Sequence, residues 1–478
     1  MFSSQKKGII LINTLVFGTL AAIMTMALIG WVALVLKNIR NIAVREQAFQ
    51  VAEAGVDYYR WHLAHSPGDF QDSTDTDGPY VHDFNDKNGL RIGEFSLEIT
   101  PPPTGSTLVT IRSTGLVDSQ PALTRTVVTQ LAIPSFAKYA VVANDTMRFG
   151  AGTEIFGPIH SNGGIRFDGL AHNLVTSSVT SYNDPDSDDC NNNNSFGVHT
   201  CVNPDDPSPP TAVPSRTDVF EAGREFPVSP VDFVGITTDL SNLKTKAQAA
   251  GFYRSGSGSQ GYEVVFKTND TFDLYRVNTI LATPNGCFYS SQANWGTWSI
   301  GTQGSARTLL GNYANPSNGV MFFEDHVWVR GQINTARITL AAGRFPDSPS
   351  THRDIIINSD LSYTNYDGQD VIGLIAQRNV SVGLSSDNDL RIDAALIAQN
   401  GRVGRYYYSS SCGSNYIRTQ LTLFGMIGTR ERYGFAYTNG TGYLNRDINY
   451  DGNLLYSPPP DFPLTSDQYQ VVSWQEEL

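Results

Sequence analysis

The sequence predicts a mainly β protein carried on one long N-terminal α-helix. The helix is indicated by the stretch 9–36, which contains no charged side chain. The β structure is indicated by short runs, from residue 90 onward, in which apolar and polar side chains alternate between turns. Charged residues make up only 17% of the 478 residues, and 43 glycines supply turns, so strands are favoured over surface helices.

The uncharged stretch 9–36 has the length of a membrane-spanning helix. At a rise of about 1.5 Å per residue it extends about 42 Å, more than the roughly 30 Å of a bilayer core. It is too long for the apolar core of a secretory signal, and no small-residue cleavage site follows it. We expect one helix over 9–66, with 9–36 in the membrane and the remainder an amphipathic stalk. Its apolar stripe comprises Ile39, Ile42, Phe49, Ala52, Val56, Tyr59 and Leu63.

Lys6, Lys7 and Gly8 precede the helix and resemble the leader of the type IV prepilin class. In that class a dedicated peptidase cuts after the glycine, the new N-terminus is methylated, and the helix packs into a filament. The resemblance implies that residues 1–8 are a leader, that the cut falls between Gly8 and Ile9, and that the partners are a membrane, a prepilin peptidase and other pilin subunits.

The stalk segment 47–55 reads QAFQVAEAG and looks like the AFxxAEAG segment of PilX-type minor pilins. Ordinary pilins carry a glutamate at the fifth mature position, which pairs with the N-terminus of a neighbouring subunit and is Asn13 here. K-type pseudopilins, at the tip of type II secretion filaments, also lack it. The resemblance therefore implies a minor subunit at the tip of a type IV pilus or type II secretion filament. The expected helix-packing residues are Ile39, Ile42, Phe49, Ala52 and Val56.

The chain after the helix divides by composition. Residues 67–89 are rich in aspartate and glycine and predict an exposed linker. Residues 90–134 alternate with period two between Pro-containing turns, which predicts a three-stranded antiparallel meander whose apolar face packs on the stalk. The tail 445–478 contains several prolines and is expected to lie extended.

Repetition is the main signal in residues 135–444. The segment Leu374–Gln377, LIAQ, recurs identically 22 residues later at Leu396–Gln399. Units of about 20–25 residues that cannot bury their own apolar face must stack on one another, which favours a right-handed parallel β-helix. A β-sandwich is the alternative, because its strands are also short and regularly spaced. A polar loop at 183–216 and a helix at 239–250 interrupt the repeats.

The four cysteines suggest two disulfides in an exported head. The economical pairing joins Cys190 to Cys201 around a local loop and Cys287 to Cys412 across a long one. Closing the longer loop would stabilise the head by about 5 kcal/mol at most. Free buried thiols are the alternative.

Catalytic motifs are nearly absent, and no enzymatic activity is expected. The segment 256–261 matches G-x-G-x-x-G but follows a predicted helix and precedes a strand, the reverse of a dinucleotide site. His160 and Ser161 are adjacent, so on a strand they point to opposite faces, which argues against a catalytic dyad. A polysaccharide-degrading β-helix would use paired acids, and the candidates would be Asp387, Asp389 and Asp393.

No cofactor is expected, although calcium is possible. Asp447, Asn449 and Asp451, followed by Gly452, match four positions of an EF-hand loop. The twelfth position, normally a bidentate glutamate, is Pro458, and an ordinary aspartate-rich turn is the alternative.

The net charge of −13 argues against broad nucleic-acid binding, because such a surface repels phosphate backbones. The sequence thus predicts a pilus-associated subunit, held in the cell membrane by its helix, with an extracellular or periplasmic head. The alternative is a membrane-anchored adhesin that binds a surface glycan or protein, for which Tyr406, Tyr407 and Tyr408 could stack on sugars. A β-helical enzyme that degrades polysaccharides is the third hypothesis.

The leader can be tested directly. Native protein should begin at a methylated Ile9, and Gly8→Ala should block maturation, because the peptidase requires the glycine in the class that this leader resembles. N-terminal mass spectrometry measures both. Intact Met1 on the mature surface protein would contradict the pilin prediction and favour the alternative, a membrane-anchored adhesin.

Overall fold

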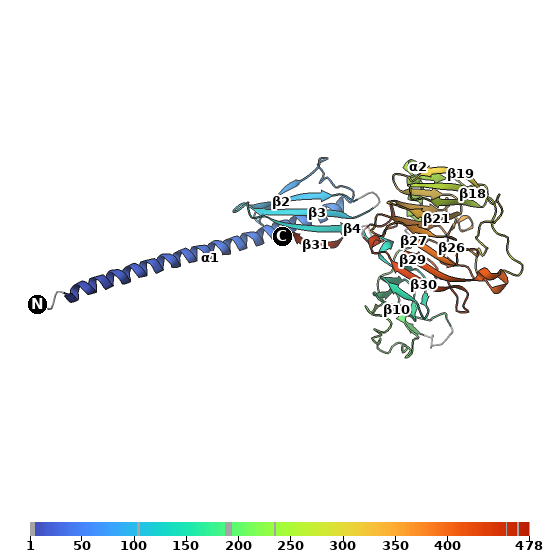
Figure 1. Ribbon diagram of the computed structural model, residues 1–478, viewed down its shortest axis with the longest axis horizontal. Helices are drawn as coiled ribbons and strands as arrows, with labels where there is room; N and C mark the ends of the chain where they lie inside the picture. Colours follow the sequence, from blue (N-terminus) through green and yellow to red (C-terminus); the bar gives the residue numbers. More distant parts are fainter. Residues whose placement is uncertain are drawn as a thin grey trace. The chain divides into compact units, whose positions relative to one another are not determined.

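The computed structural model describes residues 5–102, 106–186, 194–233, 236–455, 457–465 and 468–477. The chain divides into two units. Unit 1 comprises Met1–Pro101, Val109–Ala132 and Tyr469–Leu478, and unit 2 comprises Pro102–Leu108 and Ile133–Gln468. Each unit has its own strands and its own buried core (Figure 1).

Unit 1 begins with α1 (Gln5–His65), which confirms the predicted long helix. Among the described residues it is the one helix that is long and apolar enough to cross a membrane, and its most apolar part is fully exposed. The hydroxyls of Thr14, Thr19 and Thr25 each donate a hydrogen bond to a carbonyl one turn back in the helix. These polar groups are therefore satisfied inside the helix, as a lipid environment requires.

The second half of α1 packs on an antiparallel sheet, which confirms the predicted meander and adds two strands to it. The sheet order is β1-β2-β3-β4-β31. The prediction of a linker at 67–89 was wrong in part, because β1 lies within it and pairs with β2. The end of the tail is extended, as predicted, and forms β31, which pairs with β4. The strands are β1 (Tyr80–Asn85), β2 (Arg91–Thr100), β3 (Val109–Val117), β4 (Arg125–Ala132) and β31 (Gln470–Glu477).

The core of unit 1 lies between α1 and this sheet. Alternate residues of the strands point at the helix and are fully buried, such as Leu97, Ile111 and Leu131. Two glycines allow the backbones to approach closely. A side-chain carbon at Gly115 would lie 2.2 Å from the carbonyl oxygen of Ala48, and one at Gly55 would lie 2.3 Å from the hydroxyl of Ser113. Neither space admits an atom.

Unit 2 is built from short parallel strands that stack turn on turn in three walls, whereas the alternative β-sandwich would have antiparallel sheets. The right-handed coil stays a prediction. Wall A stacks β16 (Phe252–Arg254), β20 (Val320–Phe323), β22 (Arg337–Ala342), β25 (Val371–Ala376), β27 (Asp389–Ala398), β29 (Ile417–Thr429), β5 (Val141–Ala143), β8 (Ile159–Ser161), β11 (Val175–Ser177) and β15 (Arg224–Glu225).

Two further stacks of parallel strands form walls B and C. Wall B stacks β17 (Gly261–Phe266), β21 (Val327–Ile333), β23 (Ile355–Ile356), β26 (Val380–Val382) and β28 (Val403–Arg405). Wall C stacks β24 (Leu361–Tyr363), the first parts of β27 and β29, β30 (Gly442–Tyr450), β7 (Glu154–Phe156) and β10 (Leu170–Ala171). The predicted boundary at 444/445 therefore falls inside β30.

Smaller elements join these walls. A hairpin of β18 (Thr271–Val277) and β19 (Arg307–Ala314) extends β17 in antiparallel fashion. The other strands are β6 (Met147–Phe149), β9 (Ile165–Phe167), β14 (Val198–His199), β12 (Ser181–Tyr182) and β13 (Ser195–Phe196). Short 3-10 helices are η1 (Phe136–Lys138), η2 (Pro349–Thr351), η3 (Ser410–Cys412), η4 (Ser414–Tyr416) and η5 (Gly452–Leu455).

The order of strands in the stack differs from their order in the chain. The chain enters at β5, in the middle of wall A, and builds outward to β15. It then forms α2 (Ile236–Ala250), which confirms the predicted helix, and begins again at β16, at the other end of wall A. From β16 it returns turn by turn to β29, which pairs with β5. The helix covers the outer face of wall A with Leu240, Leu243 and Ala247.

The close contact between α1 and β3 yields a test. Gly115→Ala should destabilise unit 1 by about 2 kcal/mol or more, because the new methyl group must push the backbone of α1 away from β3. Amide hydrogen exchange of β2, β3 and β4 in the full chain in detergent measures this loss. Gly68→Ala is the control, since a side-chain carbon at Gly68 meets nothing within 4 Å. Equal protection in the two variants would contradict the packing argument.

Candidate functional site

The predicted helix-packing residues divide into two groups. Ile39 and Ile42 are 56% and 67% exposed and remain available to a neighbour. Ala52 and Val56 are buried against Val127 of β4 within the chain's own core, so the structure corrects the prediction for them. Phe49 is half-buried beside the same cluster, and its ring lies 5.9 Å from that of Trp474.

The predicted processing residues all lie in α1. Gly8 and Ile9 fall within its first turns, and Asn13 is exposed among the apolar side chains that follow. The cleavage site stays a prediction. The exposed apolar surface from residue 10 to residue 36 is the first candidate functional site, because an exposed apolar surface of this size is typical of a segment that contacts lipid or another protein.

The cysteine prediction is confirmed for one pair. Cys287 and Cys412 form a disulfide that joins the segment after β18 to the loop after β28. Cys190 lies outside the described residues, so its pairing with Cys201 stays a prediction, and no free cysteine is found among the described residues.

The possible calcium ligands do not form a loop. Asp447 and Asn449 lie in strand β30, and the Asp447 carboxylate accepts a hydrogen bond from the Gln420 amide at 2.9 Å. Asp451 is buried and accepts hydrogen bonds from the backbone and side chain of Asn453. Within the described parts of the chain, no group of three or more His, Cys, Asp or Glu side chains could hold a metal ion. Calcium binding stays a prediction.

The residues considered for catalysis have structural partners. The His160 ring bonds Thr176 at 2.9 Å and Asn162 at 3.1 Å, whereas the Ser161 hydroxyl donates to the carbonyl of Asp145. They do not pair with each other. Of the three acids, Asp387 and Asp389 are exposed. Asp393 is fully buried and accepts hydrogen bonds from the Tyr363 amide and the Tyr366 hydroxyl.

The three adjacent tyrosines also differ in role. Tyr406 and Tyr408 are buried, and burial raises the pKa of both hydroxyls. They pack with Leu384 and the Cys287–Cys412 disulfide, so they cannot stack on a sugar. Tyr407 is partly exposed, and its ring lies 4.7 Å from that of Tyr289.

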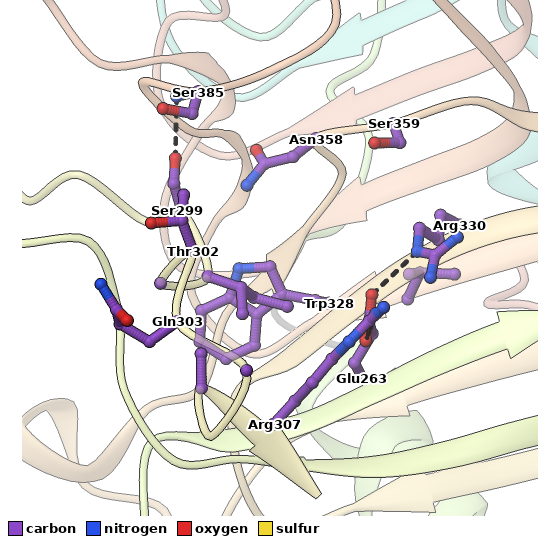
Figure 2. A pocket seen from close by; sticks show the side chains of 15 residues that line it. Glu263, Ser299, Thr302, Gln303, Arg307, Trp328, Arg330, Asn358, Ser359 and Ser385 are labelled. Carbon is purple, nitrogen blue, oxygen red and sulfur yellow. Dashed lines mark hydrogen bonds and ion pairs between the residues drawn. The ribbon is translucent and has the colours of Figure 1, made fainter. Parts of the chain in front are cut away.

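A pocket of about 480 Å³ on the outer side of wall B is the second candidate site (Figure 2). Glu263 from β17, Trp328 and Arg330 from β21, and Arg307 from β19 supply one part of its lining. The residues between β18 and β19 and the turns after β23 and β26 supply the rest, namely Ser299–Gly304, Ala306, Asn358, Ser359 and Ser385.

Charged groups gather on one side of this pocket. Glu263 is only 3% exposed, and one of its oxygens accepts a hydrogen bond from Arg330 Nε at 2.8 Å. Its other oxygen pairs with Arg307 Nη1. Figure 2 shows these three side chains together, opposite Ser299, Ser385 and Gln303. One buried carboxylate thus fixes two guanidinium groups at the pocket wall.

Hydrogen bonds connect the residues that line the rest of the pocket. The Trp328 indole donates to the Trp298 carbonyl at 3.1 Å, and the Asn358 amide donates to the same oxygen at 2.8 Å. The Ser385 amide donates to the Ser299 hydroxyl at 2.8 Å. Sequence reasoning missed this pocket, because its residues come from five separate segments and no local motif joins them.

Comparison with known proteins gives little beyond this. No protein-family model matches the sequence, and no curated protein matches it. Among solved structures, the chain is similar to the competence-associated pilin ComZ from Thermus thermophilus. The two are 13% identical, the match covers 91% of this chain and 97% of that chain, and the TM-score is 0.30. That TM-score is too low to establish a shared fold, and the function proposed below rests on this chain's own residues.

The pKa values of two histidines should be shifted in opposite directions. His160 lies in β8 of wall A, and His172 directly follows β10 of wall C. Burial lowers the pKa of His160 below 6.5. Hydrogen bonds to Glu154 and Glu221 raise the pKa of His172 above 6.5. The His172 interaction therefore stabilises the fold fully below pH 6.5 and is lost as pH rises through the folded-state pKa. For His160, the free energy of unfolding instead decreases as pH falls below 6.5, because burial disfavours the protonated ring.

The pH dependence of deuterium exchange at each imidazole C2 position, followed by mass spectrometry, gives both values in one sample. An equal pKa at the two positions would show that the surroundings of these rings are not as described.

Proposed function

We propose that this protein is a minor, type IV pilin-like subunit, inserted by the first half of α1 into a membrane and then into a filament, with its β units outside the cell. The observation that carries the proposal is the continuity of α1. One helix runs from Gln5 to His65, with its first half uncovered and apolar and its second half in the core of unit 1. A filament of packed helices needs that division, because the uncovered half must contact other helices.

The leader and the stalk support the same proposal. Lys6, Lys7 and Gly8 stand directly before the apolar stretch, where a prepilin peptidase would cut. The AFxxAEAG-like stalk points to the PilX type, although Ala52, within that segment, serves the chain's own core. A type IV pilus and a type II secretion filament both fit these features.

A position at the filament tip follows from size and charge. Unit 2 extends from Ile133 to Gln468, and a repeating shaft subunit must keep its head small enough for close axial spacing. Asn13 carries no charge, so it cannot neutralise the N-terminal amine of an adjoining subunit, where an ion pair in low dielectric would count most. Both features disfavour a repeating role and fit a subunit that caps or initiates a filament.

Incorporation should depend on the exposed stalk residues. Ile42→Asp should reduce filament incorporation at least about fivefold, because it places a charge in an apolar helix contact without touching the chain's own core. Immunogold counts and subunit immunoblots of sheared filaments measure this. Gln50→Asp is the control, since it adds the same charge at another exposed position of α1.

Immunogold labelling of the wild-type protein tests the position. Label at filament ends supports the tip. Uniform label along the shaft would refute the tip position, and no filament association at all would favour the membrane-anchored adhesin.

A further inference from the structure

The pocket on wall B holds an excess of positive charge. Glu263 bonds only Arg330 Nε and Arg307 Nη1. Within the described part of the chain, both terminal nitrogens of Arg330 and Nη2 of Arg307 have no hydrogen-bond partner. The two guanidinium groups therefore offer several N–H donors from side chains that are already held in place, which is the arrangement that binds an anionic oxygen pair well.

The remaining lining offers neutral polar groups. Thr302, Gln303 and Ser359 are at least partly exposed and line the pocket. Their hydroxyl and amide groups form no hydrogen bond with any other described residue. Each of these groups can both donate and accept, which matches the hydroxyl groups of a sugar. Figure 2 shows Gln303 and Ser359 at different edges of the pocket, so a ligand with several hydroxyls could reach both.

Part of the pocket lining is apolar, and hydrogen bonds hold one lining segment in place. Trp328 is 3% exposed, and Ile300 and Val329 lie with it in the lining. The segment that carries Ser299–Gly304 is tied back by hydrogen bonds from the Leu281 amide to the Ser299 carbonyl and from the Gly301 amide to the Thr279 carbonyl. The Cys287–Cys412 disulfide ties an earlier part of the connection between β18 and β19 to the loop after β28. A preformed site loses little entropy when it binds.

The charge and the volume of the pocket together limit the classes of ligand that it can bind. The chain carries a net charge of −13, yet this pocket contains two arginines and one glutamate, so the local sign is opposite to that of the whole protein. A cavity of about 480 Å³ has room for a few sugar rings but not for a folded partner. Guanidinium pairs recognise carboxylates, and hydroxyl and amide groups recognise sugar hydroxyls.

We propose that this pocket binds an acidic carbohydrate, with a sugar carboxylate on Arg307 and Arg330 and the ring hydroxyls on Thr302, Gln303 and Ser359. This role is independent of the filament assignment, because the pocket lies entirely within unit 2. It gives the displayed head a defined ligand class.

Isothermal titration calorimetry of the full chain in detergent micelles tests the proposal. The probe is a galacturonic acid trisaccharide, and its methyl ester is the uncharged counterpart with the same hydroxyls. The acid should bind, and the ester should bind at least about tenfold more weakly, since it lacks the charge-assisted hydrogen bonds. Equal affinity for the two, or no binding of the acid, would overturn the proposal.

Variants locate the site. Arg307→Gln should weaken binding of the acid at least about tenfold, and Gln303→Ala should weaken acid and ester alike, by about threefold. Arg276→Gln is the matched control, because Arg276 lies on the neighbouring strand β18, outside the pocket lining, and should leave the affinity unchanged. Gln303 is exposed, so its variant tests the site even if loss of Arg307 disturbs the fold.

Competition separates the possible sources of the anion. Inorganic phosphate should displace the trisaccharide only at concentrations far above those of the sugar. Displacement by phosphate at an equal concentration, or full affinity in both the Arg307 and Gln303 variants, would show that sugar recognition at this pocket is wrong.

Discussion

The rest of unit 1 depends on the contact between the second half of α1 and strands β2, β3 and β4. Because α1 is continuous, the contacts that hold its second half to the sheet also connect its exposed apolar half to a folded domain without an intervening loop. Gly55 and Gly115 set the distance, since any side chain there would collide with the opposite backbone or side chain. The apolar residues of the stalk are thereby committed to the chain's own core, and only the uncovered part of the helix remains for other molecules.

The stack in unit 2 follows a second constraint, which is that strands in the middle of wall A, such as β20, β25 and β5, are buried on both faces. The inner face of wall A packs in the main core, and its outer face lies beneath α2 and the segment near η5. A strand in this position loses the alternation of an ordinary surface strand and becomes continuously apolar, as Val371–Ala376 is. The two identical LIAQ segments follow from this, because Leu374 stacks directly on Leu396 and Ile375 on Ile397.

Local patterns predicted the long helix, the meander, α2 and the parallel stacking, because each depends on residues close in sequence or on a visible repeat. The pairing of β31 with β4 and the return of the chain from β29 to β5 could not be predicted in this way, since nothing near Val141 or Gln470 marks a partner hundreds of residues away. The same limit explains the missed pocket. The error over Ala52 and Val56 has another cause: an apolar stripe shows that a helix face is covered, but not by which molecule.

The pairing of the last strand with the fourth has a consequence for the order in which unit 1 can be completed during synthesis. Strand β4 can complete its ladder only after the segment Gln470–Glu477 has been made, because β31 supplies its outer neighbour. A chain that stops early leaves the edge of β4 unpaired and Phe49 of α1 without the Trp474 ring. The sheet of unit 1 is therefore complete only when the segment Gln470–Glu477 is present, although the other four strands lie more than 300 residues earlier in the chain.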